Sequence, residues 1–340
     1  MPPKLLNKAE QAMFQNWDSA CAALHIPQQG QATRWVLLGA TGILWELEGR
    51  HRGRQGARMG QLIDGAHHLP FEHLITEGAY QVGATYERSN INKRIISFPV
   101  ILGGPKYSAH AYRMIETNFW DSLPHDKPFW LGCHTMFGGW RWIEVRLAEV
   151  VKTPMKIDSV AFQNNTMQWE IKLLACKPWY AKRMLIERWT AHPETVAARG
   201  FDEETISIAN RGDMPARFLA MYTGPGRAWI QDGITSRMVE LPLLTSKDGY
   251  ALVDSNEGAR TLTGATDPVD NIFYDWIRGS RILDFFLHDI AALGVPVWRR
   301  KYVRFTSDIP PRTVANIKVR HDTAGGQVIL MMPQRFTRPV

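Results

Sequence analysis

Short runs of β-branched and aromatic residues, separated by turns that contain glycine or proline, recur along most of this chain. The segment 140–149 shows the pattern, with Ile143, Val145 and Leu147 on one parity and Trp142, Glu144 and Arg146 on the other. A period of two is that of an extended strand with one buried face and one solvated face. The chain is therefore predicted to be mainly β, with a few helices.

The expected strands fall into two groups. The first group comprises the runs 33–38, 43–48, 79–87, 91–101, 129–134, 140–149 and 167–176. The second comprises 205–209, 216–222, 228–230, 237–241, 250–253, 272–277, 314–319 and 328–332. The segment 191–200 between them is polar and carries little pattern. Because 340 residues usually exceed one hydrophobic core, we expect two domains, 1–195 and 200–340. Short strands at this spacing favour a sandwich or jelly roll in the second domain.

Two connections in the first group are expected to be hairpins. The runs 79–87 and 91–101 meet at Ser89-Asn90, and both are expected to be long, half-buried strands. The glycine- and arginine-rich segment 49–60 is expected to be a loop between the strands of another long hairpin.

Two helices are expected. The first carries one apolar stripe, formed by Leu5, Ala9, Met13, Trp17, Ala20 and Leu24, and it ends at Pro27 and Gly30. Its polar face mixes acids with lysine, which favours packing on a domain or a neighbouring subunit over a membrane surface. The second begins at Ser108 and is closed by Pro124. Its core-facing residues are expected to be Tyr112, Met114, Ile115 and Phe119.

Charge and cysteine content restrict the function classes. The net charge of +7 is moderate, so it permits nucleic-acid binding without requiring it. Cys21, Cys133 and Cys176 lie far apart and form no C-x-x-C pair, so we expect neither a zinc site nor a disulfide framework. Unpaired thiols fit a reducing cytoplasm. We also expect no signal peptide and no membrane span, because no run approaches the ~20 apolar residues that a span needs.

Two short motifs resemble functional sites but are better explained as turns. The segment 39–42 resembles the start of a dinucleotide-binding loop, yet Trp45 takes the position of the third glycine and a strand-like run follows. We therefore interpret it as a hairpin turn. The Arg-Gly-Asp tripeptide 211–213 lies between two expected strands, where glycine and aspartate are ordinary turn residues.

A group of imidazole and carboxylate side chains is the candidate for metal binding. It consists of His67, His68, His73, Glu72 and Glu77. Pro70 interrupts the segment, so no helix places two ligands on one face, and a solvated loop is expected. The sequence also lacks a G-x-S-x-G elbow and any carboxylate pair with a glycosidase-like spacing. We therefore predict no catalytic residue, no metal and no cofactor.

The candidate contact residues are arginines and tryptophans. Arg50, Arg52, Arg54 and Arg58 suit a phosphate contact. A mobile loop or an inter-subunit salt-bridge contact is favoured over it, because no aromatic residues are interleaved. The chain has 13 tryptophans, which favour core packing and subunit contacts. Stacking on sugars is the alternative, and its candidates are Trp229, Trp276 and Trp298.

Two stretches of the sequence resemble the siphophage distal tail protein family. The first comprises 94–100, 119–123, 130–132, 140–147, 169–175 and 177–180, and is similar to the strands and helix of the family's N-terminal domain. The second comprises 206–216, 224–225 and 249–254, and is similar to the start of its C-terminal domain. The sequence as a whole is similar to those of minor tail proteins of phages that infect actinobacteria. The N-terminal helix and the arginine loop extend beyond the usual family pattern.

The resemblance implies both a fold and a role. The fold would be a tail-tube-like β-sandwich with a flanking helix, followed by a galectin-like jelly roll. The protein would be a non-enzymatic structural component of the virion, assembled in the host cytoplasm and located at the tail tip. Six copies would form a ring that joins the tail tube protein to the tail-tip hub or baseplate protein. DNA would pass through the ring without sequence-specific contacts, and no membrane would be involved.

Two other functions remain open at this point. A carbohydrate-binding module that recognises a host cell-wall glycan would need exposed aromatic residues along a groove of the C-terminal domain. A cell-wall hydrolase is the third hypothesis, and it depends on the phage resemblance alone.

Overall fold

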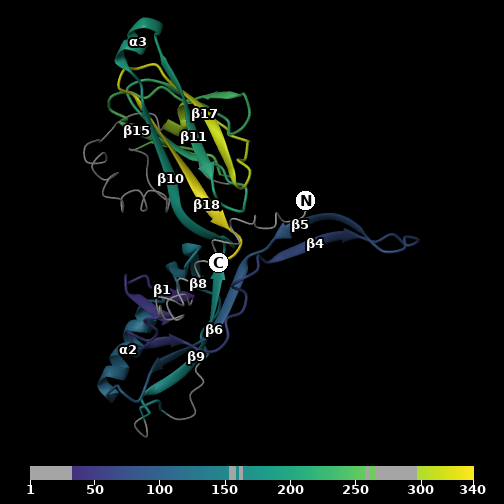
Figure 1. Cartoon of the computed structure of the whole chain (residues 1–340), viewed down its shortest axis with the longest axis vertical. Helices are drawn as coiled ribbons and strands as arrows, with labels where there is room; N and C mark the ends of the chain where they lie inside the picture. Colours follow the sequence, from purple (N-terminus) through teal and green to yellow (C-terminus); the bar gives the residue numbers. More distant parts are fainter. Residues whose placement is uncertain (1–32, 153–157, 161–163, 257–260, 265–296) are drawn as a thin grey trace, which may run out of the picture. The chain divides into compact units, whose positions relative to one another are not determined.

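The computed structural model describes residues 33–152, 158–160, 164–256, 261–264 and 297–340. The described chain is mainly β with few helices, which confirms the fold class predicted from the alternating pattern (Figure 1). It forms two compact units, one of residues up to Tyr180 together with Thr337–Val340, and the other of Ala181–Phe336. The chain therefore passes from one unit to the other twice, after Tyr180 and after Phe336.

The first unit contains a run of seven antiparallel strands in the order β2-β1-β7-β8-β9-β6-β3. Their bounds are β1 Arg34–Leu38, β2 Leu44–Glu48, β3 Ala57–Met59, β6 Arg94–Gly103, β7 Phe129–Thr135, β8 Gly139–Leu147 and β9 Thr166–Ala175. The longest pairing joins β6 and β9 from Arg94↔Ala175 to Gly103↔Thr166. Alternate residues of these two strands are buried, as the period-two pattern predicted.

Helix α2 (Ala109–Asp121) closes the core of this unit. The Ser108 hydroxyl accepts a hydrogen bond from the Ala111 amide and caps the helix, as the sequence predicted. Tyr112 and Phe119 are buried, and the Phe119 ring lies edge-on against Trp45 at 5.1 Å between centroids. Met114 is half exposed at 51%, so its predicted place in the core is wrong. It lies on the solvent side of a helix whose buried stripe is narrow.

The strand β5 (Thr85–Ile91) does not pair with β6, so the predicted hairpin over residues 79–101 is wrong. Its partner is β4 (Phe71–Thr76), which lies in a segment that was predicted to be a loop. The reason is long-range pairing, because β6 is occupied along its whole length by β9 and along part of it by β3. The segment 49–60 follows β2 and contains β3, but β3 pairs with β6 and β2 pairs with β1. The segment therefore does not join two strands of one hairpin, and that expectation is wrong.

The second unit has two sheets. One has the order β11-β17-β13-β14, and the other the order β16-β15-β12-β18-β10. The strands are β10 Tyr180–Thr190, β11 Asp202–Asn210, β12 Leu219–Thr223, β13 Ala228–Gln231, β14 Met238–Glu240, β15 Tyr250–Asp254, β16 Leu262–Gly264, β17 Thr313–His321 and β18 Gln327–Phe336. Two short helices, α3 (Pro193–Arg199) and α6 (Val297–Arg300), complete the described elements.

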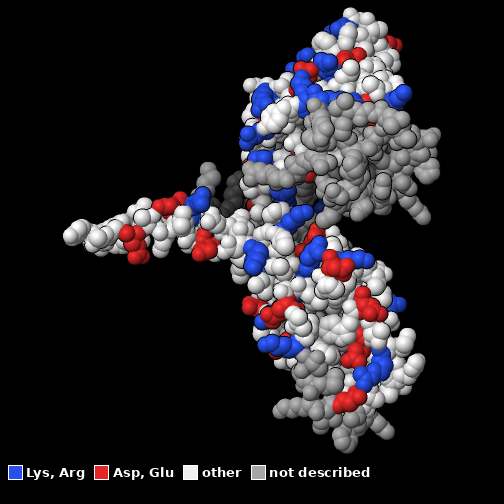
Figure 2. All heavy atoms as spheres, turned by 180° about the vertical axis from the view of Figure 1, so that it is seen from behind, with Lys and Arg blue, Asp and Glu red and all other residues white. Residues whose placement is uncertain are grey.

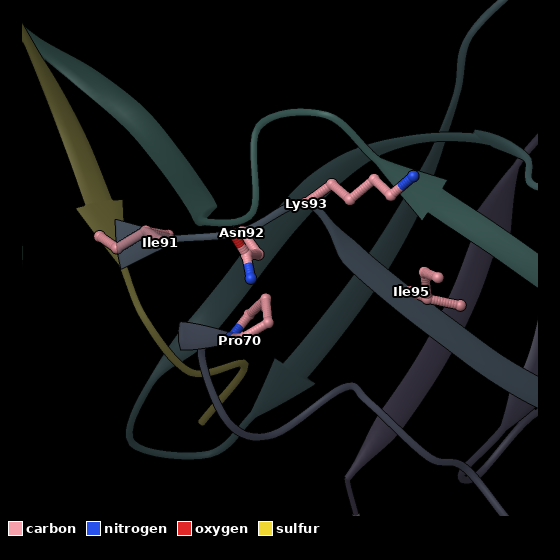
Figure 3. A pocket seen from close by; sticks show the side chains of 5 residues that line it. All are labelled: Pro70, Ile91, Asn92, Lys93 and Ile95. Atoms are coloured by element: carbon pink, nitrogen blue, oxygen red, sulfur yellow. The ribbon is translucent and has the colours of Figure 1, made fainter. Parts of the chain in front are cut away.

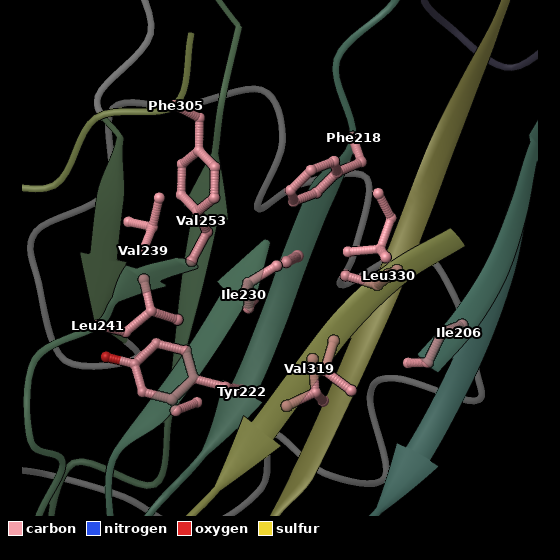
Figure 4. Packing of buried hydrophobic residues seen from close by; sticks show 14 of the residues in the cluster. Ile206, Phe218, Tyr222, Ile230, Val239, Leu241, Val253, Phe305, Val319 and Leu330 are labelled. Carbon is pink, nitrogen blue, oxygen red and sulfur yellow. The ribbon is translucent and has the colours of Figure 1, made fainter. Parts of the chain in front are cut away.

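One hydrophobic cluster is shared by both sheets of this unit (Figure 4). Ile230 and Val319 come from the first sheet, and Tyr222, Val253 and Leu330 from the second. All five are fully buried. Burial of this kind stabilises a fold by roughly 25 cal/mol per Å² of apolar surface.

Several sequence predictions for the second half differ from the structure or fall outside it. The segment 191–200 contains α3, with Pro193 in its first turn and Gly200 in the left-handed conformation at its end. Seven helical residues are too few to show an apolar stripe, so the pattern missed them. The expected boundary at 195–200 falls on α3, and both β10 and α3 belong to the second unit apart from Tyr180. The expected strand 272–277 and the expected N-terminal helix lie outside the described residues.

The β17 strand offers a matched test of the second unit's core. Val319 is fully buried, whereas Val314 on the same strand is 63% exposed. We expect Val319→Ala to lower the free energy of unfolding by about 2 kcal/mol, because it leaves a cavity in the shared cluster. Val314→Ala should change it by less than about 0.5 kcal/mol. Urea denaturation of both variants measures the difference, and equal losses would contradict the assigned core.

Candidate assembly surface

The β4–β5 hairpin is an arm that projects from the first unit (Figure 1). We define the arm as residues 71–91. Every residue of both strands is exposed, and the two strands form a sheet of their own. Large apolar side chains lie on its surface at Phe71, Ile75 and Tyr86, and at its tip Tyr80 and Val82 are fully exposed.

Contacts inside the arm are local. The His73 ring packs between Phe71 and Tyr86, at 4.8 Å and 5.5 Å between centroids. The Ser89 hydroxyl hydrogen-bonds the His73 ring at 2.7 Å and the Tyr86 hydroxyl at 2.8 Å. These contacts order one side of the ribbon without burying a core. An isolated two-stranded ribbon is marginally stable in water, and its unpaired edges favour pairing with another chain. The arm therefore has the properties of a surface that is covered in an assembly.

A hollow of about 710 Å³ lies at the base of the arm (Figure 3). It is lined by Pro70, Ile91, Asn92, Lys93 and Ile95. Three of these side chains are apolar, and Lys93 is the one charged group. A lining of this kind can receive an apolar side chain, but it contains no pair of groups suited to acid–base or nucleophilic chemistry.

A buried arginine holds the base of the arm. Arg94, the first residue of β6, is 1% exposed. Its guanidinium donates to the Pro178 carbonyl at 2.9 Å and to the Thr337 carbonyl at 2.7 Å. It also donates to the carbonyl of Ala66, and to that of Gly65 at 3.4 Å. The charge is thus satisfied by four backbone carbonyls, one of the few ways to bury a cation at tolerable cost.

Tyr180 completes this arrangement. Its ring lies 5.1 Å from the Arg94 guanidinium, and its hydroxyl donates to the Ala66 carbonyl at 3.0 Å. Burial raises the pKa of Tyr180 and lowers that of Arg94. The raised pKa keeps the Tyr180 phenol neutral at neutral pH. Arg94 therefore links the residues just before the arm with Pro178 and Thr337, which lie close in sequence to the two points where the chain passes between the units.

Of the four arginines predicted as contact residues, one is already engaged within its own loop. The Arg52 side chain pairs with Glu48 at 3.0 Å and donates to the Met59 carbonyl at 2.6 Å, so it closes its own loop. Arg50 and Arg54 are exposed, and Arg58 is half-buried on β3. Within the described ranges, no acidic partner is seen for these three.

The glycine motif and the Arg-Gly-Asp tripeptide are turns, as predicted. The segment 39–42 joins the antiparallel strands β1 and β2, and Gly39 lies so close to Ser122 that a Cβ there would clash. The tripeptide follows β11, and the Gly212 amide donates to the Asn210 side chain at 3.0 Å.

The histidine group is a solvated loop only in part: His67, His68 and Glu77 are exposed and lie outside any strand, whereas Glu72 and His73 lie in β4. His67 is placed separately, with its ring edge-on to Trp35 at 6.4 Å. In the described part of the chain, no three His, Cys, Asp or Glu side chains are placed to hold a metal ion. Cys133 is buried and Cys176 is exposed, and Cys21 lies outside the described residues. Burial raises the pKa of the Cys133 thiol to about 12, which makes it a poor nucleophile.

Of the three tryptophans proposed for sugar stacking, Trp229 is the one with a described side chain. Trp229 lies half-buried on β13, and the Arg320 guanidinium is 6.0 Å from its ring. Arg320 is itself held by Glu203 at 2.6 Å. Trp276 and the side chain of Trp298 lie outside the described residues. The glycan-stacking site therefore stays a prediction.

The sequence matches no protein-family model and no curated protein. Among solved structures, it is similar to the Dit protein (gp 19.1) of phage SPP1, described as a paradigm of the hub adsorption apparatus in phages that infect Gram-positive bacteria. The TM-score is 0.53 at 10% identity, over 90% of this chain and 99% of that chain. The phage p2 baseplate in its activated conformation also matches, with a TM-score of 0.47 at 11% identity over 85% and 98%.

At this level of identity, the likeness to SPP1 Dit shows a shared fold. It confirms, for the fold, the resemblance that the sequence predicted. No helix in the described ranges is long and apolar enough to span a membrane.

Removal of the Arg94 guanidinium tests its anchoring role. We expect Arg94→Met to destabilise the first unit by about 3 kcal/mol, because buried carbonyls would lose their donors. Amide hydrogen exchange at residues 64–66 should become at least tenfold faster than in the wild type. The control is Arg113→Met, which removes an exposed ion pair with Asp158 and should cost less than about 1 kcal/mol. Wild-type exchange rates in Arg94→Met would contradict the anchor.

Proposed function

We propose that this protein is a structural subunit of a bacteriophage tail, in which six copies form a ring through their first units. The ring would join the tail tube to the tail-tip hub or baseplate and would leave a channel for DNA. The exposed arm carries this proposal, since a ribbon without a core is explained by a neighbour that covers it.

The fold supports the same role. The chain spans nearly all of the SPP1 Dit protein, a component of a phage hub adsorption apparatus. The described residues also offer no constellation that suits catalysis: the hollow contains one charged group, and the buried cysteine is protonated. A scaffold needs neither a metal nor a nucleophile. The proposed role is accordingly non-enzymatic.

A cyclic ring fits the arm better than a two-fold dimer does. In a ring, each copy presents one surface to the next copy and a different surface to the previous one. A projecting arm on one side can then be covered by the body of the neighbour all the way round. Six copies would carry a formal charge of +42 (6 × 7), which suits passage of DNA without sequence-specific contacts.

Self-assembly is tested by the mass of the purified protein across a concentration series. Light scattering behind a sizing column should give six times the 38.7 kDa mass of one chain, and negative-stain images should show rings. The variant Ile75→Ser, on the arm, should shift the ring towards monomers, because it removes apolar surface from the proposed contact. Ile234→Ser in the second unit is the control, since Ile234 is similarly exposed, and it should leave the ring intact.

Two outcomes would contradict the proposal. The first is a wild-type protein that stays monomeric at every concentration. The second is a ring that loses stability equally in both variants, because the arm would then have no special part in assembly. The location is tested separately: antibodies against the protein should label the tail tip of the phage particles that contain it.

A further inference from the structure

We infer that the arm of one copy binds the arginine loop of the next copy by charge complementarity. We define the arginine loop as residues 49–58. This inference rests on the proposed ring and names the two surfaces that meet in it.

The arm is acidic as well as apolar. Residues 71–91 contain Glu72, Glu77 and Glu87 against the single cation Arg88, a formal charge of 1 − 3 = −2. All four residues are exposed. In the view of Figure 2, acidic side chains are spread along the arm and its tip is uncharged. A partner for this arm therefore needs an apolar contact for the tip and positive charge beside the strands.

The arginine loop carries the opposite charge. Residues 49–58 contain four arginines and no acid, a formal charge of +4. Arg52 is neutralised by Glu48, whereas Arg50 and Arg54 project into solvent without an acidic partner among the described residues. Fixed cations with no local partner favour contact with an anionic surface.

The two surfaces lie on separate sides of the same unit. The arginine loop packs beside α2, because Gly56 lies so close to Ile115 that a Cβ there would come within 2.5 Å of it. In Figure 1, α2 and the arm lie on opposite sides of the first unit. The arm of a copy therefore cannot reach its own arginine loop. A head-to-tail ring needs two different, complementary surfaces placed in this way.

The alternative partner for the arginines is DNA phosphate. Arginine suits phosphate oxygens well, but the loop has no interleaved aromatic residue for stacking on bases. Phosphate binding would also leave the acidic residues of the arm unexplained. A second copy of the chain accounts for both surfaces with one contact.

The test is a charge-reversal exchange with the full chain. The loop variant is Arg50→Glu/Arg54→Glu, and the arm variant is Glu72→Lys/Glu77→Lys. The arm variant changes the formal charge of the arm from −2 to +2 and so opposes it to the basic loop. The loop variant lowers the formal charge of the loop from +4 to 0 and puts acids at positions 50 and 54, which are exposed and have no acidic partner among the described residues. In each case the concentration needed for half-assembly should rise at least tenfold. An equimolar mixture should restore rings, because in an alternating ring the lysines of the basic arm meet the acids introduced at positions 50 and 54, and the acidic arm meets the unchanged arginine loop. A chain with all four substitutions should assemble by itself for the same reason.

The matched control is Arg211→Glu/Lys247→Glu, which makes the same charge change as the loop variant on exposed residues of the second unit. It should assemble like the wild type, and circular dichroism should show all variants folded. Light scattering at low and high salt measures assembly, and added salt should weaken the wild-type ring. Fluorescence anisotropy with a short labelled DNA duplex measures nucleic-acid binding by the wild type and the loop variant.

The possible results separate the two proposals. If the wild type and both single variants form rings equally well, the proposed charge contact is wrong, whereas the proposed ring is supported. The same holds if both variants weaken assembly but their mixture restores none. Lower DNA affinity of the loop variant with an unchanged ring would assign the arginines to DNA instead. A wild type that never assembles overturns the proposed ring, and this inference with it.

Discussion

The buried Arg94 guanidinium is the interaction on which the arrangement of the first unit depends. Its four acceptors come from the chain just before the arm, from the end of the segment that follows β9, and from the returning C-terminal residues. A single cation thus joins parts of the chain that are far apart in sequence. Carbonyl dipoles replace the lost hydration without a counter-charge, so the site is selective for a planar donor with several N–H groups.

The hydrogen bonds of Arg94 lie at the base of the exposed arm. A two-stranded ribbon with every residue exposed gains little stability from itself, so its direction must be set where it leaves the unit. The second unit shows the opposite design, with two sheets that share one hydrophobic cluster. The second unit therefore has a core between its own sheets, whereas the arm leaves apolar and charged side chains exposed.

The proposed contact follows from this incomplete surface and not from any reactive group. The arm carries acids and an uncharged tip, and the arginine loop carries cations on the side of α2. Complementary charges set the register and the rate of association more than they add affinity, since exposed ion pairs contribute little each. The apolar side chains of the arm would supply most of the binding energy, and the charges would select the correct neighbour.

The sequence by itself determined the local structure. Period-two alternation identified β8 and β9, and Ser108 marked the start of α2, because these signals depend only on neighbouring residues. Strand partners were decided by the tertiary structure: β6 pairs with β9 over a long sequence separation, which leaves β5 to pair with β4. A strand was expected over 79–87, but β4 and its pairing with β5 were not, because a ribbon exposed on both faces has no alternating pattern. Arg94 looked like an ordinary strand residue. Which carbonyls surround it, and on which sides of the unit the arm and the arginine loop lie, depend on contacts between distant segments that no local pattern encodes.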